Sequence, residues 1–343
     1  MWRDEVYYHA LVCYPSPIRR IEMSIVKLGI MGCADIAWRA MAPAAMECTE
    51  IDLVVMASRG AEKARKFANQ FNCEQLVGYD KLLERDDIDV VYMPLPTGLH
   101  YKWVIRALEA GKHILVEKSF AADYKTCQTM VKMAREKNLL ILENFLFPHH
   151  SQHDWVKDYI SSGKLGEIQL FRSTFGFPPL LKDNFRYTRE LGGGSLLDAG
   201  AYVVKAATLF IGSDLILLGA ALKYDDVLGV DIYGDAMFKN YKGQIAQVSF
   251  GFNYFYQCNC EFLGSKGKLV VERAFTPPPG FRPVVRVEKQ DKSTKITLPA
   301  DNHYVNMFSF FADAVKKQGD FSTHWNDLLV QSELLESIRK EGT

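Results

Sequence analysis

Between residues 26 and 145, short apolar runs alternate with stretches of helical periodicity, and this alternation restricts the possible folds more than any other feature. Strands are expected at 26–31, 51–57, 90–93, 114–116 and 139–143, and helices from the turn after residue 31 to about 48 and at 61–71, 79–85, 98–110 and 121–137. Short, continuously apolar strands separated by helices are typical of a parallel sheet covered on both faces. The sequence therefore predicts an α/β domain with a doubly wound parallel sheet over residues 26–145.

After residue 145 the strands follow one another closely, and few helices separate them. Strands are expected at 167–177, 215–223, 230–238, 244–252, 258–263 and 268–272, and helices at 152–162, 195–210, 303–317 and 326–340. This pattern predicts an α+β domain with a mostly antiparallel open sheet over residues 146–343. Residues 1–25 fit neither pattern, and we interpret them as an N-terminal extension.

Length and charge exclude several functional classes. The 343 residues correspond to two domains at roughly 150 residues each. The 41 basic residues equal the 41 acidic residues, which argues against a nucleic-acid or anionic-membrane partner. We find no signal peptide and no apolar run long enough to span a bilayer. The odd number of cysteines, seven, without a repeated CxxC spacing indicates reduced thiols and a cytoplasmic protein.

The first strand runs directly into Gly32-x-Ala34-x-x-Ala37, a variant of the glycine-rich turn that binds dinucleotides. Gly32 permits the tight turn, a small residue at 34 admits a diphosphate, and Ala37 allows the helix to pack closely. The unpaired N–H groups at the start of the following helix suit phosphate oxygens. We expect a Rossmann cofactor site formed by Gly32, Cys33, Ala34, Asp35 and Ile36, although an ordinary tight turn has the same local pattern.

The end of the second strand distinguishes between the two nicotinamide cofactors. NAD sites usually carry an acidic residue there for the ribose hydroxyls, whereas this strand ends in Ser58-Arg59-Gly60. A serine hydroxyl and a guanidinium can both bind a 2′-phosphate. The sequence therefore favours NADP(H) over NAD(H), and the alternative is that Arg59 is a solvated residue at a helix start.

Two motifs carry a resemblance to a known family: VVYMPLPTGLH at 90–100 and ALEAGKHILVEK at 107–118. They resemble the glucose–fructose oxidoreductase / inositol dehydrogenase (Gfo/Idh/MocA) family of nicotinamide-dependent sugar oxidoreductases. The resemblance covers nearly all of the chain after Met23. Residues 32–39, 143–153 and 190–202 are most similar to the nucleotide-sugar 3-ketoreductases of deoxysugar biosynthesis, with the dihydrodiol dehydrogenases next.

The family's Glu-Lys pair beside the nicotinamide corresponds to Glu117 and Lys118. The resemblance implies that Glu117 lies at the cofactor and that Lys118 polarises the substrate carbonyl, although position alone would favour an ordinary lysine at a strand end. The family usually has proline after this lysine, and this chain has Ser119. The same resemblance implies that Pro96, Thr97 and His100 help to form the cofactor pocket.

Asp198 and Tyr202 lie four residues apart in a predicted helix, so their side chains should share one face. Many members of the family have histidine at the second position, and the resemblance implies that tyrosine replaces it in the ketoreductase and dihydrodiol subgroups. A phenol with a pKa near 10 is protonated at neutral pH and can donate a proton to an alkoxide. The alternative is a tyrosine that only packs in the core.

The aromatic and basic segment 175–189 offers candidates for substrate binding. We expect Phe177, Arg186 and Tyr187 to contact a sugar or its diphosphate, since arginine suits phosphate geometry. The alternative is a loop that packs on the neighbouring helix. The three histidines His149, His150 and His153 lack a complete ligand set, and we expect no metal site.

Together these features predict an NADP-dependent reductase of a keto-sugar, nucleotide-linked and reduced at C3. Alternatives are a dehydrogenase of a free sugar, cyclitol or trans-dihydrodiol, and a non-enzymatic NADP-binding sensor. The resemblance also implies a homo-oligomer, a dimer or a tetramer.

Overall fold

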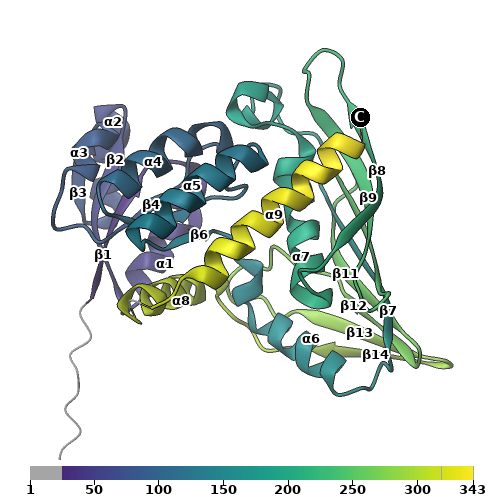
Figure 1. Ribbon diagram of the computed structural model, residues 1–343. Coiled ribbons are helices and arrows are strands. Elements are labelled where there is room, and N and C mark those ends of the chain that lie inside the picture. Colours follow the sequence, from purple (N-terminus) through teal and green to yellow (C-terminus); the bar gives the residue numbers. More distant parts are fainter. Residues whose placement is uncertain (1–24, 318, 343) are drawn as a thin grey trace, which may run out of the picture.

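The computed structural model describes residues 25–317 and 319–342, in which two sheets lie side by side and share the C-terminal helices (Figure 1). The predicted extension, up to residue 24, lies outside the described residues. All strand pairs of the first sheet are parallel, in the order β3-β2-β1-β4-β5-β6. Its strands are β1 Val26–Met31, β2 Ile51–Ser58, β3 Glu74–Val77, β4 Val90–Met93, β5 His113–Val116 and β6 Ile141–Glu143.

Helices cover both faces of this sheet, which explains why its central strands are apolar throughout. The helices are α1 Ala42–Glu47, α2 Ala61–Phe71, α3 Tyr79–Leu83, α4 His100–Glu109 and α5 Tyr124–Lys137, and a π-helix, Ala37–Met41, precedes α1. Every residue of β4 is buried. The predicted doubly wound sheet is confirmed. The sequence did not reveal β3, because this edge strand is largely exposed and carries no apolar run.

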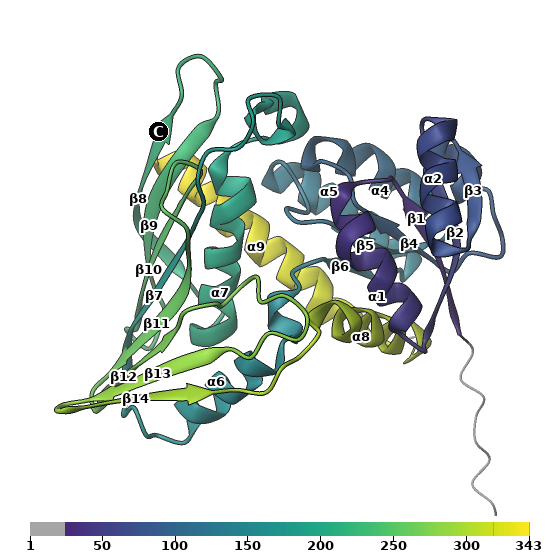
Figure 2. The ribbon, with the colours of Figure 1, turned by 180° about the vertical axis from the view of Figure 1, so that it is seen from behind.

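The second sheet has the order β14-β13-β12-β11-β7-β10-β9-β8. Its pairs are antiparallel except β7 with β10, so the mostly antiparallel sheet is confirmed. The strands are β7 Ile168–Gly176, β8 Ile216–Tyr224, β9 Asp231–Lys239, β10 Ile245–Gly251, β11 Gln257–Gly264, β12 Gly267–Val271, β13 Val284–Lys289 and β14 Lys292–Thr297. Helices α6 Ser151–Ser161 and α7 Ala201–Ile211 lie on one face, and the other face is left open (Figure 2).

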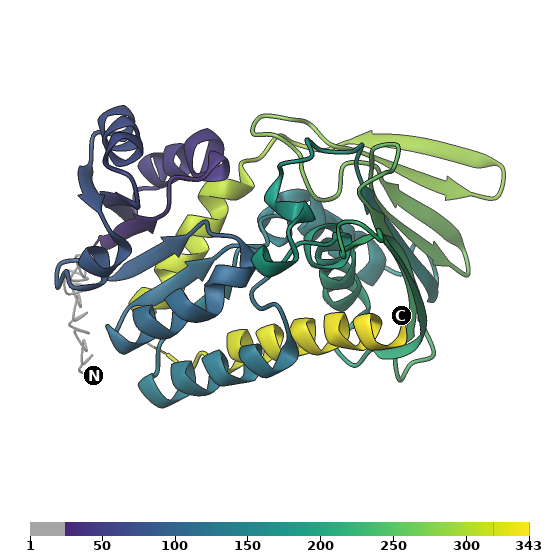
Figure 3. The same ribbon diagram turned by 90° about the horizontal axis from the view of Figure 1, so that it is seen from above.

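The last two helices, α8 His303–Lys317 and α9 Ser322–Glu341, connect the two halves. Phe308 and Phe311 of α8 belong to the core of the first sheet, whereas Leu335 and Ile338 of α9 belong to the core of the second. Helix α9 runs beside α5 and continues to the second sheet (Figure 3). The two sheets are therefore held together by one packed helix, and the division of the chain at residue 145 stays a prediction.

One helical run, Arg189–Ile211, is long and apolar enough to cross a membrane. Of its most apolar window, 67% is buried inside the protein, where α7 packs against the second sheet, so the run is accounted for as a core helix. The six cysteines in the described part of the chain form no disulfide.

The two halves pack closely at Gly98, where an added Cβ would lie 2.3 Å from the carbonyl oxygen of Glu190. The Cβ is attached directly to the backbone and the carbonyl oxygen is part of it, so neither atom can rotate away. We expect Gly98→Ala to lower the free energy of unfolding by about 1–3 kcal/mol, the usual range for overpacking. Thermal denaturation checks this against Gly219→Ala, whose added methyl would meet nothing within 4 Å. Equal melting temperatures for the two variants would contradict the prediction.

Candidate active site

A cleft of about 870 Å³ opens between the two sheets, at the carboxyl ends of the parallel strands. Open α/β sheets bind their ligands at this edge. Eleven of the residues singled out from the sequence line the cleft: Ala34, Asp35, Ile36, Pro96, Thr97, Glu117, Lys118, Phe177, Arg186, Asp198 and Tyr202. Six others do not line it: Gly32, Cys33, Ser58, Arg59, His100 and Tyr187.

The turn after β1 has the geometry that a dinucleotide requires. Gly32 has a φ of +125°, and a Cβ there would lie 2.9 Å from the Leu95 side chain. Its N–H donates to the Ala57 carbonyl at 2.9 Å, which places the ends of β1 and β2 together. Ser58 is buried at this position, and the exposed Arg59 follows it. The turn and this pair of residues therefore fit the diphosphate and the 2′-phosphate of NADP(H), respectively.

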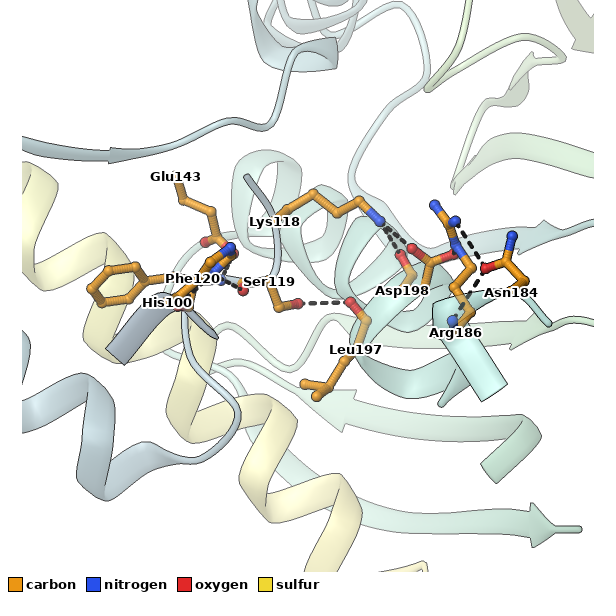
Figure 4. A network of polar contacts seen from close by, with 9 residues as sticks. All are labelled: His100, Lys118, Ser119, Phe120, Glu143, Asn184, Arg186, Leu197 and Asp198. Atoms are coloured by element: carbon orange, nitrogen blue, oxygen red, sulfur yellow. Dashed lines mark hydrogen bonds and ion pairs between the residues drawn. The ribbon is translucent and has the colours of Figure 1, made fainter. Parts of the chain in front are cut away.

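Lys118, Asp198 and Arg186 form one ionic network across the cleft (Figure 4). The Lys118 ammonium donates to the Asp198 carboxylate and, at 3.2 Å, to its backbone carbonyl. Arg186 Nε donates to the other carboxylate oxygen at 2.7 Å. Burial alone would raise the pKa of Asp198, but the two cations lower it to about 2. Asp198 is therefore a carboxylate at neutral pH that holds two cations.

This network changes the interpretation of Arg186. The sequence suggested that Arg186 contacts a substrate diphosphate, and the side chain does line the cleft. Its Nε is nevertheless committed to Asp198, so the residue also orients that carboxylate. Tyr187 lies behind the cleft, where its hydroxyl accepts the Leu180 N–H at 2.9 Å and its ring packs against Phe252.

The Tyr202 side chain has a packed ring and an available hydroxyl. The ring lies 4.9 Å from that of Phe175 and 5.5 Å from that of Phe145, centre to centre. Within the described residues the hydroxyl forms no hydrogen bond, and Lys118 Nζ lies 5.1 Å from the ring centre. Burial, together with the carboxylates of Glu117 and Asp198, raises the pKa of Tyr202 well above 10. The phenol is therefore protonated and free to donate to a ligand.

The helix that carries Asp198 and Tyr202 is not regular at its start. Leu196–Gly200 forms a π-helix, and α7 begins only at Ala201. Both side chains reach the cleft, but not through the regular α-helical spacing that the sequence suggested. Asp231 of β9 fixes this start, accepting the Ser195 hydroxyl at 2.7 Å and the Leu196 N–H at 2.6 Å.

Two residues that the sequence did not single out orient Glu117. One carboxylate oxygen accepts the Tyr92 hydroxyl and the Asn144 side-chain amide, each at 2.7 Å. Tyr92 lies inside a buried strand and has the pattern of a core residue. Asn144 directly follows β6, and its position at a strand end is the one signal that could have identified it.

His100 supports the cleft from behind its wall. The ring is buried, and burial lowers its pKa. Nδ1 lies 3.0 Å from the Ser119 carbonyl oxygen and 3.1 Å from that of Phe120, while Nε2 lies 2.8 Å from that of Leu95. His100 thus fixes the turn after Lys118, whose Lys118–Ser119 peptide bond is cis. In the described part of the chain, no three His, Cys, Asp or Glu side chains are arranged to hold a metal ion.

Comparison with known proteins identifies the family. Residues 26–145 match the model of an oxidoreductase family with an NAD-binding Rossmann fold, and residues 153–270 match the GFO/IDH/MocA C-terminal domain. The chain belongs to the Gfo/Idh/MocA family of oxidoreductases. The resemblance found in the sequence is confirmed.

Several relatives are similar over most of their length. The dTDP-3,4-didehydro-2,6-dideoxy-alpha-D-glucose 3-reductase of Actinomadura kijaniata is 41% identical over 315 residues, 92% of this chain and 95% of the relative. The enzyme of the same name from Saccharopolyspora spinosa is 43% identical over 291 residues, 85% and 88% of the two chains. The crystal structure of KijD10, a 3-ketoreductase from Actinomadura kijaniata in complex with NADP and TDP-benzene, superposes with a TM-score of 0.89 at 40% identity, covering 92% and 97%.

Glu143, at the end of β6, is a buried carboxyl group whose pKa is raised to near neutral pH. Its carboxylate accepts the Phe120 N–H at 2.8 Å, in the turn that follows Lys118. Burial raises the pKa of Glu143 to about 7, despite the opposing effects of that N–H and of Lys205 and Lys118. An exposed glutamate titrates at about 4.3.

The folded state therefore binds the Glu143 proton more tightly than the unfolded state does. The contribution of Glu143 to the free energy of unfolding decreases as the pH rises from about 4.3 through about 7. Glu143→Gln keeps an acceptor for the Phe120 N–H and removes the titration. We expect the melting temperature of this variant, relative to the wild type, to increase between about pH 5 and about pH 8. Glu109→Gln, on the exposed end of α4, is the control and should show a constant difference. A constant difference for Glu143→Gln would contradict the prediction.

Proposed function

We propose that this protein reduces the C3 ketone of a nucleotide-linked keto-sugar with NADPH, in the biosynthesis of a deoxysugar. The observation that carries this proposal is that the unbonded Tyr202 side chain and the Lys118 ammonium both line the cleft, with Nζ 5.1 Å from the Tyr202 ring centre and held by Asp198. An acid and a cation placed together are the groups that carbonyl reduction requires.

NADP(H) as the cofactor agrees with the NADP in the KijD10 complexes. When bound, NADPH supplies the hydride. The turn at Gly32–Ile36 would hold the diphosphate, Ser58 and Arg59 the 2′-phosphate, and Glu117 would lie at the nicotinamide end of the cleft.

The proposed roles of the side chains follow from their charges. Lys118 donates a hydrogen bond to the carbonyl oxygen and draws electron density from the carbon. As hydride reaches that carbon, the Tyr202 hydroxyl gives its proton to the oxygen, which yields a secondary alcohol and the oxidised cofactor. The resulting tyrosinate takes a proton from solvent. Asp198 and Arg186 keep Lys118 in place throughout.

The relatives support the substrate class. The relatives from Actinomadura kijaniata and Saccharopolyspora spinosa are named as 3-reductases of a dTDP-linked keto-sugar. Solved variants of KijD10 replace one lysine and one tyrosine, and these are separated by as many residues as Lys118 and Tyr202 are here.

Turnover of a dTDP-linked 3-keto-sugar, compared with free sugars, cyclitols and trans-dihydrodiols, distinguishes the proposal from the alternative dehydrogenases. Cofactor binding without any turnover would favour the sensor.

We also propose a cytoplasmic homo-oligomer. The open face of the second sheet presents apolar side chains on β8 and β9, since Ile216, Leu218, Tyr233 and Met237 are 54%, 49%, 40% and 39% exposed. Such a patch suits a second copy of the chain.

Removing the proton donor or the cation should impair the chemical step alone. Tyr202→Phe and Lys118→Ala should each lower kcat by roughly 10²–10⁴-fold, the usual contribution of a positioned acid. NADPH binding, measured by fluorescence titration, should change little. Tyr241→Phe, at an exposed tyrosine in the turn between β9 and β10, is the control. Wild-type turnover in both site variants would refute the assigned roles.

The cofactor preference depends on Arg59. Arg59→Ala should weaken NADPH binding by roughly tenfold or more, about 1.4 kcal/mol, through loss of a charge-assisted bond to the 2′-phosphate. NADH binding should be unchanged, because NADH lacks that phosphate. Arg65→Ala, at an exposed arginine on α2, the helix that follows Arg59, is the matched control. An equal effect on NADPH and NADH binding would show that Arg59 does not bind the 2′-phosphate.

A further inference from the structure

Ser119 directly follows Lys118, and its side chain forms a bond that the proposed reaction does not itself use. The residue is 1% exposed. Its hydroxyl donates to the carbonyl oxygen of Leu197 at 2.7 Å, across 78 residues of sequence (Figure 4). Leu197 lies in the π-helix directly before Asp198. The bond therefore joins the cofactor side of the cleft to the helix that carries the other two reactive side chains.

Two links thus connect the same two short segments. Lys118 bonds to Asp198, and the next residue, Ser119, bonds to the residue before Asp198. The lysine reaches its partner through a flexible four-carbon stem, which tolerates movement of the backbone behind it. A serine side chain has a single rotatable bond before its oxygen, so its bond fixes the backbone itself.

The remaining contacts of this turn face the first sheet. His100 contacts the carbonyl oxygens of Ser119 and Phe120, and Glu143 accepts the Phe120 N–H. These groups hold the turn in place but do not set its separation from the helix at 196–200. The Ser119 hydroxyl contributes that constraint.

We propose that Ser119 is a positioning residue for the ketone reduction, holding Lys118 at the separation from Asp198 and Tyr202 that the reaction needs. This inference rests on the proposed function. The family usually has proline here, which has no hydroxyl to donate.

Ser119→Ala removes one oxygen from a buried site and should leave the fold intact. We expect kcat to fall by roughly tenfold, with the KM for NADPH unchanged, because loss of one hydrogen bond loosens the reacting geometry only. Ser119→Thr retains the hydroxyl and should restore turnover. The matched control is Ser173→Ala, which removes a similar buried bond, to the Asn259 carbonyl at 2.9 Å, away from the cleft.

A second measurement does not depend on the substrate. Labelling of Lys118 by an amine reagent, followed by peptide mass spectrometry with NADP⁺ present, reports how firmly Asp198 holds the ammonium. Ser119→Ala should increase the labelling rate several-fold, whereas Ser173→Ala should not. If the wild type fails to reduce a dTDP-linked keto-sugar, the proposed function fails while the labelling still tests Ser119. Unchanged kcat and labelling in Ser119→Ala, or an equal loss of turnover in Ser173→Ala, would overturn the inference.

Discussion

The arrangement of the cleft depends on one buried carboxylate, that of Asp198, shared between Lys118 and Arg186. An isolated carboxylate in this position would lose its hydration without compensation, and the two cations prevent this. Because Lys118 lies in the turn after β5 of the first sheet and Asp198 lies in the π-helix before α7 in the second half, the ion pair is also a contact between the two halves. The same interaction therefore stabilises the cleft and aligns its reactive groups.

An ion pair sets this alignment only if the backbone on both sides is already fixed. Helix α9 contributes side chains to both cores, so the halves share one packed element. Asp231 anchors the start of the helix that carries Asp198, and His100 anchors the turn after Lys118. Buried charges are weak sources of stability but demanding in geometry. The apolar core thus supplies the stability, and the charges select the arrangement in which the cleft is complete.

The sequence predicted the features that depend on a local pattern of residues. Apolar runs predicted the central strands, and a motif that resembles the family's Glu-Lys pair predicted Glu117 and Lys118. Three strands were missed because none of them carries a long apolar run. Strands β3 and β14 are largely exposed strands at the sheet edges, and in β13, next to β14, buried and partly exposed residues alternate. The supporting residues Tyr92, Asn144 and Asp231 were missed for another reason: each acts on a side chain or backbone brought near only by folding. Sequence motifs identify the residues that react, whereas the residues that position them are brought together only by the packing of the folded chain.

The raised pKa of Tyr202 has a consequence for the chemistry. A phenol whose proton is held this tightly is a weak acid, and transfer to an alkoxide would leave a tyrosinate among aromatic rings. The Lys118 ammonium lies 5.1 Å from that ring, and the network of Lys118, Arg186 and Asp198 carries one more positive than negative charge. This charge offsets the Glu117 carboxylate, which raises the pKa of Tyr202, and it favours the negative charge that passes from the alkoxide to the phenol oxygen. A second cation on Asp198 is therefore important, since a single lysine–aspartate pair beside Glu117 would leave a net negative charge next to the Tyr202 phenol.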